Sequence, residues 1–135
     1  MKRLLFTLVS TLVVIFLYSA NTSDKEEMVI RIADLQIEPA HLSAYKQLLT
    51  KEATESVRLE TGVICIFPMY DQQDSTRIRI LEIYGNRQAY ESHLKTPHFL
   101  QYKGAVSDMV ISLELIDMKA LDPEIMTSIF SKVGH

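Results

Sequence analysis

Strand-like and helix-like segments follow one another in an order that leaves this 135-residue chain few possible folds. Segments 28–37, 63–70, 76–84 and 110–118 are rich in β-branched and apolar residues, which predicts strands. Helical spacing of apolar residues follows the first and the third of these segments. A helix after the first and third strands of a four-stranded antiparallel sheet is the ferredoxin-like arrangement. This is an α+β fold with its helices on one face of the sheet.

The second predicted strand is apolar on both faces, which a small domain does not easily cover alone. It spans 63–70 and reads Val-Ile-Cys-Ile-Phe-Pro-Met-Tyr. One face of this strand can pack on the chain's own helices. The simplest way to bury its other face is contact with a second copy of the chain. Pro68 cannot donate a hydrogen bond to a neighbouring strand, so it indicates a sheet edge or a bulge. We therefore expect a homodimer.

The first predicted helix begins at Glu38-Pro39, since proline suits a first helical turn, and runs to about Glu60. Its apolar stripe, at three- and four-residue spacing, consists of Leu42, Tyr45, Leu49, Ala53 and Val57. Gly62 follows as a residue that can adopt the left-handed conformation of a helix cap. His41 lies in the first turn, and we expect its side chain to face solvent.

The segment 82–102 concentrates the candidate reactive groups. It combines a strand end, a helix over 87–95 capped by Asn86, and a second helix that Thr96-Pro97 opens. On this pattern His93 points inward. His98 falls in the first turn of the second helix, where the helix dipole disfavours protonation.

Two further features of the chain concern its last strands and its tail. Glu82 shares a strand face with isoleucines, so this carboxylate needs a partner or a raised pKa.

The strand over 110–118 closes the predicted domain, which spans 28–118. In the C-terminal tail, 119–135, Asp122-Pro123-Glu124 opens a short amphipathic helix.

The first twenty residues have the pattern of a secretory signal peptide. Met1-Lys2-Arg3 is basic, 4–18 is apolar apart from three hydroxyl residues, and 21–27 is a polar leader. The apolar run is short for a membrane span of about 20 residues. We expect cleavage near Ala20 and export to the periplasm, the alternative being an uncleaved membrane anchor through 4–18.

Composition excludes several classes of protein. Loss of the signal peptide removes Lys2 and Arg3, so 12 basic residues face 17 acidic ones and no basic stripe remains for nucleic acid. The single cysteine, Cys65, excludes an internal disulfide and the usual zinc-binding spacings, so the sequence predicts no metal site.

Several short runs resemble the antibiotic biosynthesis monooxygenase (ABM) family, and particularly its quinol-monooxygenase-like members. The matching residues are Glu60-Thr61-Gly62, the run Ile-Leu-Glu-Ile-Tyr at 80–84, Ala89, His93, and Thr96-Pro97-His98-Phe99. The last two fit the family's H-x-x-T-P-H-F signature. The resemblance covers about 28–118 and implies a dimeric α/β barrel in which two sheets pack back to back.

The resemblance also implies a range of activities. Many members oxygenate electron-rich phenols or quinols with molecular oxygen and no metal, flavin or haem. Others isomerise small sugar-derived signals, degrade haem, or have no known activity. The chain contains no tryptophan, on which haem-degrading relatives depend. The export signal disfavours antibiotic tailoring enzymes and cytoplasmic isomerases.

Cofactor-free oxygenation requires a base, because the substrate donates electrons to oxygen as its anion. A neutral imidazole is a natural base near neutral pH, so His93 or His98 is the candidate, with Glu82 or Tyr84 as the group that orients it or binds a substrate hydroxyl. The alternative is structural, with His93 a core histidine bonded to Glu82 or a backbone carbonyl and His98 part of the capping turn.

The hypothesis from the sequence is therefore a cofactor-independent monooxygenase for a small phenolic or quinol compound. Tyr84, Tyr70 and Phe99 are the candidate substrate-binding residues, and His93, His98 and Glu82 the catalytic ones. The alternatives are a non-oxidative isomerase on the same fold and a non-catalytic dimer that binds a small molecule. The need for oxygen distinguishes the monooxygenase from the isomerase. A cavity that the histidines reach distinguishes both enzymes from the non-catalytic dimer.

Overall fold

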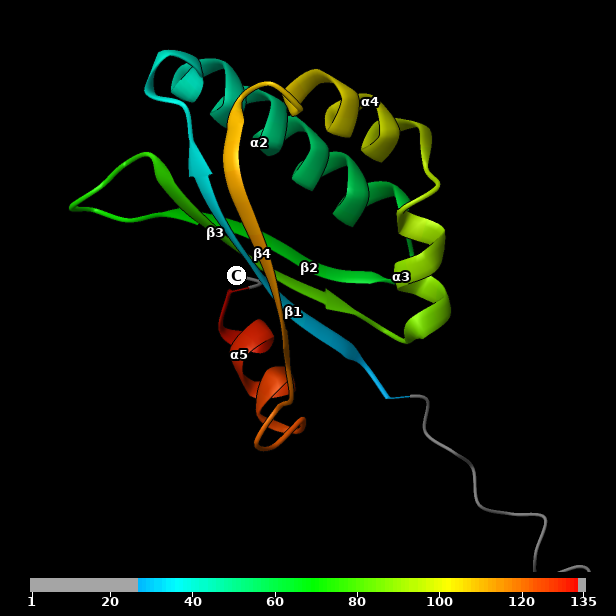
Figure 1. Cartoon of the computed structure of the whole chain (residues 1–135). Helices are drawn as coiled ribbons and strands as arrows, with labels where there is room; N and C mark the ends of the chain where they lie inside the picture. Colours follow the sequence, from blue (N-terminus) through cyan, green and yellow to red (C-terminus); the bar gives the residue numbers. More distant parts are fainter. Residues whose placement is uncertain (1–26, 134–135) are drawn as a thin grey trace, which may run out of the picture.

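A four-stranded antiparallel sheet forms the base of the structure, a computed structural model that describes residues 27–133 (Figure 1). The strands are β1 (Val29–Ile37), β2 (Val63–Tyr70), β3 (Arg77–Tyr84) and β4 (Val110–Met118), in the spatial order β2-β3-β1-β4. This is the predicted ferredoxin-like arrangement. Strand β2 lies at an edge, as Pro68 indicated. The predicted signal peptide and nearly all of the polar leader lie outside the described residues.

The helices between β1 and β4 pack on one face of the sheet (Figure 1). The first begins as a 3₁₀ turn, η1 (Pro39–His41), and continues as α2 (Leu42–Leu59). After β3 come α3 (Arg87–His93) and α4 (Pro97–Val106), which meet at a corner. The tail helix α5 (Ile125–Val133) lies on the opposite side of the sheet from α2. His41 is exposed, as predicted. None of these described helices is long and apolar enough to span a membrane.

The hydrophobic core lies between the sheet and α2. Its members come from the inward faces of β1, β2 and β3, from one stripe of α2 and from the end of α4. They are Ala33, Leu35, Ile37, Tyr45, Leu49, Ala53, Val63, Ile66, Ile78, Ile80, Tyr84 and Val106. Burying each large side chain of this kind stabilises the fold by about 1.5–3 kcal/mol.

One part of the predicted helix stripe is wrong. Val57 is 46% exposed, whereas Glu52 is 4% exposed and Ser56 is fully buried. A four-residue step along a helix turns about 40° past a full circle, so a stripe read at every fourth residue rotates out of the core. The inward face of α2 therefore ends in polar residues.

The predicted left-handed cap at Gly62 is also wrong, since no described glycine has a positive φ. Gly62 is needed for a close approach. A Cβ atom there would lie 2.5 Å from the Cβ of Ala89 in α3. The amide of Gly85 donates a hydrogen bond of 2.9 Å to the carbonyl of Gly62, which holds the α2–β2 and β3–α3 turns together. The absent side chain thus lets α3 pack against the end of α2.

We expect Gly62→Ala to destabilise the protein by about 1 kcal/mol. Overpacking costs roughly 1–3 kcal/mol, and the lower chain entropy of alanine offsets about 0.4–1 of it. The matched control is Gly104→Ala in α4, where an added Cβ meets no atom within 4 Å. Urea denaturation should show the control to be neutral or stabilised. Equal stability of the two variants would contradict this explanation of Gly62.

The face of the sheet that points away from α2 carries a continuous apolar row. Phe67 pairs with Leu81, Leu81 with Ile32, and Ile32 with Ile116, so the row crosses all four strands. Directly paired residues of neighbouring strands project to the same face. Phe67 is 57% exposed and Ile116 is 37% exposed. This surface, called here the apolar row, leaves large hydrophobic side chains in contact with solvent.

Candidate active site

The corner between α3 and α4 is fixed by two capping side chains, as the sequence predicted. Asn86 accepts a hydrogen bond of 2.8 Å from the amide of Ala89. The Thr96 hydroxyl accepts from the amide of Phe99 and donates to the carbonyl of His93, at 3.4 Å and 2.8 Å. One side chain therefore joins the end of α3 to the start of α4. It sets the position of His93 relative to His98.

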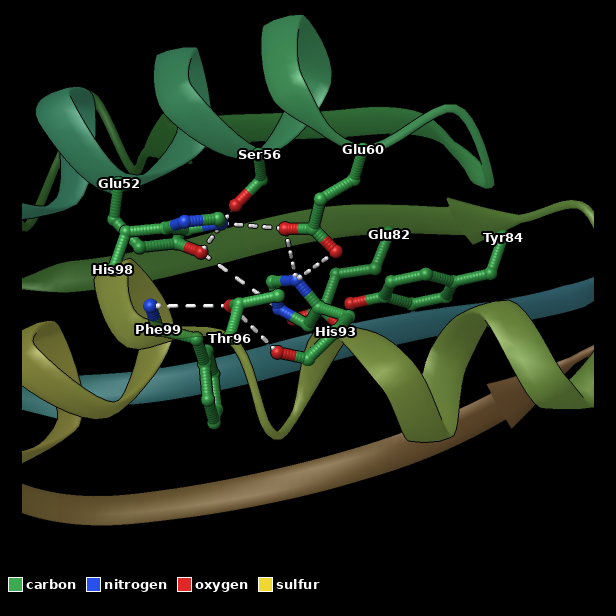
Figure 2. A network of polar contacts seen from close by, with 9 residues as sticks. All are labelled: Glu52, Ser56, Glu60, Glu82, Tyr84, His93, Thr96, His98 and Phe99. Atoms are coloured by element: carbon green, nitrogen blue, oxygen red, sulfur yellow. Dashed lines mark hydrogen bonds and ion pairs between the residues drawn. The ribbon is translucent and has the colours of Figure 1, made fainter.

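Both imidazoles point at the carboxylate of Glu60, the residue that follows α2 (Figure 2). The Nδ1 atom of His93 lies 3.0 Å from Oε1 of Glu60 and 3.3 Å from Oε2. The Nε2 atom of His98 lies 2.6 Å from the same Oε1. Only 2% of His93 is exposed, and 13% of the His98 and Glu60 side chains. The three residues, of which His93 is buried and the other two are partly buried, form a group called here the Glu60 cluster.

The shared carboxylate determines which ring nitrogens carry protons. A carboxylate oxygen only accepts hydrogen bonds, so His93 donates from Nδ1 and His98 from Nε2. In the neutral rings the lone pairs then lie on Nε2 of His93 and Nδ1 of His98. The Nε2 atom of His93 lies 3.7 Å from Oε1 of Glu52, inside the protein. In His98 the basic nitrogen is Nδ1, the ring nitrogen that does not contact Glu60.

Glu52 lies behind His93 on the inward face of α2. The Ser56 hydroxyl donates a hydrogen bond of 2.7 Å to its Oε1. Burial raises the pKa of the Glu52 carboxyl, while the hydrogen bond from Ser56 and the nearby histidines lower it. A proton therefore has four neighbouring groups to occupy, from Glu52 through His93 and Glu60 to His98.

Glu82 and Tyr84 lie on β3 beside His93 (Figure 2). The Tyr84 hydroxyl donates to Oε2 of Glu82 at 3.0 Å. Burial raises the pKa of Glu82, against the hydrogen bond from Tyr84 and the charges of His93 and Arg31. Burial also raises the pKa of Tyr84 well above its usual range. The carboxylate that holds both histidines is thus Glu60, and Glu82 is held by Tyr84.

Arg31 is a buried cation beside this site that the sequence analysis missed. It pairs with Glu82 in the β1–β3 register. Its guanidinium donates to Oδ1 of Asp117 at 2.6 Å and 2.7 Å and to the hydroxyl of Tyr90 at 2.6 Å. Arg31 therefore supplies positive charge to the helix-facing side of the sheet.

The structure brings together most of the predicted site residues. Glu60 joins His93 and His98, and the hydrogen-bonded pair of Glu82 and Tyr84 lies beside them. The ring centroids of Tyr84 and Phe99 lie 5.4 Å and 4.7 Å from that of His93. Tyr70 lies apart. It is 58% exposed near the other end of β2, with the Lys46 ammonium 3.9 Å from its ring centroid.

Glu52, Ser56 and Glu60 were missed as site residues because the apolar stripe alone defined the inward face of α2. Their spacing is a signal that could have found them. Residues four apart lie on the same side of a helix, so three polar residues at this spacing form one polar edge. In the sequence, Glu60 stands out only as the end of the predicted helix and as part of the Glu60-Thr61-Gly62 motif.

Comparison with known proteins identifies similar chains. Residues 28–105 match the sequence model of a family described as antibiotic biosynthesis monooxygenase. A solved structure from Bacteroides thetaiotaomicron, named for the same family, is 39% identical, with 72% of this chain and 92% of that one covered and a TM-score of 0.71. One from Deinococcus radiodurans is 25% identical, with coverage of 70% and 93% and a TM-score of 0.62.

A more distant structure, named for the same family and from Nitrosomonas europaea, supports the fold alone. It is 22% identical, with coverage of 73% and 94% and a TM-score of 0.68. The comparison with curated proteins found no match.

Proposed function

Because the chain belongs to the antibiotic biosynthesis monooxygenase family, we propose that it oxygenates a small phenolic or quinol compound with molecular oxygen and without a cofactor. The observation that carries this proposal is the Glu60 cluster, in which one carboxylate holds two imidazoles. Such an arrangement stabilises the protonated form of a base, as a carboxylate does for the histidine of a catalytic triad.

In the proposed reaction the Nδ1 atom of His98 removes the hydroxyl proton of the quinol. Glu60 accepts the hydrogen bond from Nε2 of His98 at 2.6 Å and stabilises the resulting imidazolium. His93, held by the same carboxylate, fixes the position of Glu60 and so acts as a positioning residue. General base catalysis of this kind contributes typically 10²–10⁴-fold to a rate.

The remaining steps balance in atoms and electrons. The quinolate gives one electron to O₂, and the two radicals combine through a new carbon–oxygen bond to a peroxide anion. This anion takes the proton held by His98 and becomes a hydroperoxide. His98 then removes the proton of the peroxide-bearing carbon, the O–O bond breaks, and the hydroxide that leaves takes this second proton from His98 to form water. A hydroquinone and O₂ thus yield a hydroxyquinone and one water, with four electrons passing from substrate to oxygen.

Other residues of the network are suited to holding the substrate. The buried pair of Glu82 and Tyr84 is a candidate to bind a second substrate hydroxyl, since both groups are hydrogen-bonding partners in an apolar setting. Phe99 packs against His93 and offers an aromatic surface for a ring. Tyr70 would take part only at a distance from the histidines or through a second copy of the chain.

The test is oxygen uptake by the purified protein with a panel of hydroquinones, catechols and naphthoquinols. We expect one O₂ consumed per quinol and one atom of ¹⁸O in the product. The His93→Ala, His98→Ala double variant should lower the rate to the uncatalysed level. Uptake that this variant leaves unchanged would remove the roles of both histidines.

A non-oxidative isomerase is the second candidate, and one observation favours it. The groups from Glu52 to His98 could shuttle a proton between two carbons of a substrate, which needs no oxygen. Turnover under strict anaerobiosis would support this candidate over the monooxygenase.

We also propose that the protein is a homodimer in which the apolar row of one copy covers that of the other. Phe67→Asp should dissociate it, because a charge placed within an apolar interface costs at least about 2 kcal/mol, or about 30-fold in Kd. The control is Leu100→Asp on α4, a similarly exposed residue on the helical side. Sedimentation should find monomers for the first variant and dimers for the second; dimers in both would refute the interface.

The N-terminal pattern supports a further proposal, export to the periplasm with removal of residues 1–20. Its basic head, apolar run and polar leader have the lengths that secretion signals require. The mass and the cell fraction of the mature protein would test it.

A further inference from the structure

We infer that Glu60, His93 and His98 bind one divalent transition-metal ion, and that this ion competes with the proton-transfer role of the same residues. Only the claim that the ion competes with proton transfer rests on the proposed function. The binding itself follows from the donor atoms. A carboxylate oxygen and two imidazole nitrogens are the protein ligands of many catalytic zinc sites, with a further position open to solvent or substrate.

The donor atoms already converge. The ligand atoms of these three residues all lie within 4.8 Å of one another. Two of the separations, both to Oε1 of Glu60, are 3.0 Å and 2.6 Å. Around a tetrahedral ion with bonds of about 2.0–2.2 Å, neighbouring ligand atoms are about 3.3–3.6 Å apart, so these two separations must lengthen by roughly 0.3–1 Å. Small side-chain rotations would therefore place an ion where the two N–H hydrogens now lie.

The supporting elements are rigid. Glu60 follows α2, His93 ends α3, and His98 lies in the first turn of α4. The Thr96 hydroxyl links α3 to α4, and the close approach of Gly62 to Ala89 links α3 to the end of α2. Sites built on packed helices hold their ligands more accurately than sites on loops.

A second carboxylate, that of Glu52, lies next to the ring nitrogen of His93 that would not bind the ion. If Nδ1 of His93 binds the ion, its remaining proton lies on Nε2, which faces Oε1 of Glu52 at 3.7 Å. A metal-binding histidine almost always donates its other N–H to a carboxylate, a carbonyl or water. Glu52 is itself oriented by the Ser56 hydroxyl. The buried carboxylates of Glu52 and Glu60 would together match the charge of a divalent ion.

An ion at this position prevents Glu60 from accepting hydrogen bonds from the two rings. It also fixes each ring in the tautomer opposite to the one that base catalysis uses. We therefore expect Zn²⁺ to inhibit any activity that depends on His98 as base and a chelator to restore it.

The test measures binding without substrate. Metal-free protein is titrated with Zn²⁺ by calorimetry, and Co²⁺ is added to read ligand geometry from its absorption spectrum. We expect one ion per chain. Glu60→Gln and His98→Ala should each weaken Zn²⁺ binding at least 100-fold, and Glu52→Gln about 10–100-fold. The control, His41→Ala, removes an exposed histidine of η1 and should bind as the unchanged protein does.

Two outcomes would overturn the inference. One is the absence of stoichiometric binding by the folded, unchanged protein. The other is binding that Glu60→Gln and His98→Ala leave intact while circular dichroism shows both variants to be folded. Neither readout uses a quinol or oxygen. Failure of the proposed oxygenase reaction would therefore leave the metal-binding result unaffected, and absence of metal binding would leave the oxygenase proposal standing.

Discussion

Glu60→Gln is expected to lower the rate of quinol oxidation about 100-fold, the lower end of what general base catalysis contributes. The amide keeps the size of the side chain but removes its charge, so the imidazolium that forms on His98 loses its counter-ion. The NH₂ group that replaces one carboxylate oxygen also cannot accept a hydrogen bond, so His93 loses its 3.3 Å contact with Oε2. Steady-state kinetics should place the loss in kcat, with KM nearly unchanged.

The matched control for this prediction is Glu91→Gln on α3. Glu91 is exposed and pairs with Arg87 within one helix, away from the Glu60 cluster. Its replacement should leave kcat and the stability nearly unchanged, since exposed pairs contribute about 0–1 kcal/mol. Glu60→Asp should recover part of the activity because it restores the charge. Full activity of Glu60→Gln, or no recovery with aspartate, would contradict the assigned role.

Glu82→Gln is expected to stabilise the protein at neutral pH. The folded protein raises the pKa of Glu82, mainly through burial, so it binds this proton more tightly than the unfolded chain does. The associated stability is fully present below the unfolded pKa and is lost as the pH rises through the folded pKa. Each unit of difference between the two pKa values corresponds to about 1.4 kcal/mol at a pH above both.

The measurement is the free energy of unfolding from urea titrations between pH 4 and pH 8. The unchanged protein should lose stability relative to Glu82→Gln as the pH rises through this range. Tyr84→Phe is the companion variant, because it removes the hydroxyl that donates to Glu82 and should make the loss larger. A stability difference between the unchanged protein and Glu82→Gln that does not vary with pH would refute the raised pKa.

The fold was largely predictable because hydrophobic periodicity and capping residues are local. The strands, the Thr96-Pro97 restart and the edge position of Pro68 all follow from residues within a few positions of one another. The Glu60 cluster was not predictable in the same way, since His93 and Glu60 are 33 positions apart. Sequence spacing placed both histidines near Glu82, and only tertiary packing brings the end of α2 over them.

Polar residues on the inward face of α2 were the main source of error. A period-based stripe assigns apolar residues to the core and treats glutamates as solvent-facing. Glu52 violates this rule, and such exceptions are expected at functional sites, where stability is given up for chemistry. The motif Glu60-Thr61-Gly62 combined both roles, because Gly62 packs the helices and Glu60 holds the histidines.

The contact between Gly62 and Ala89 has a consequence for how the reactive geometry can change over evolution. The distance between His93 and Glu60 depends on how closely two backbones approach at a point outside the reactive group itself. One methyl group added or removed there would act as a spacer, shifting a donor relative to its acceptor by tenths of an ångström. Relatives could thus adjust the acidity or the metal preference of their histidines without replacing a single reacting residue.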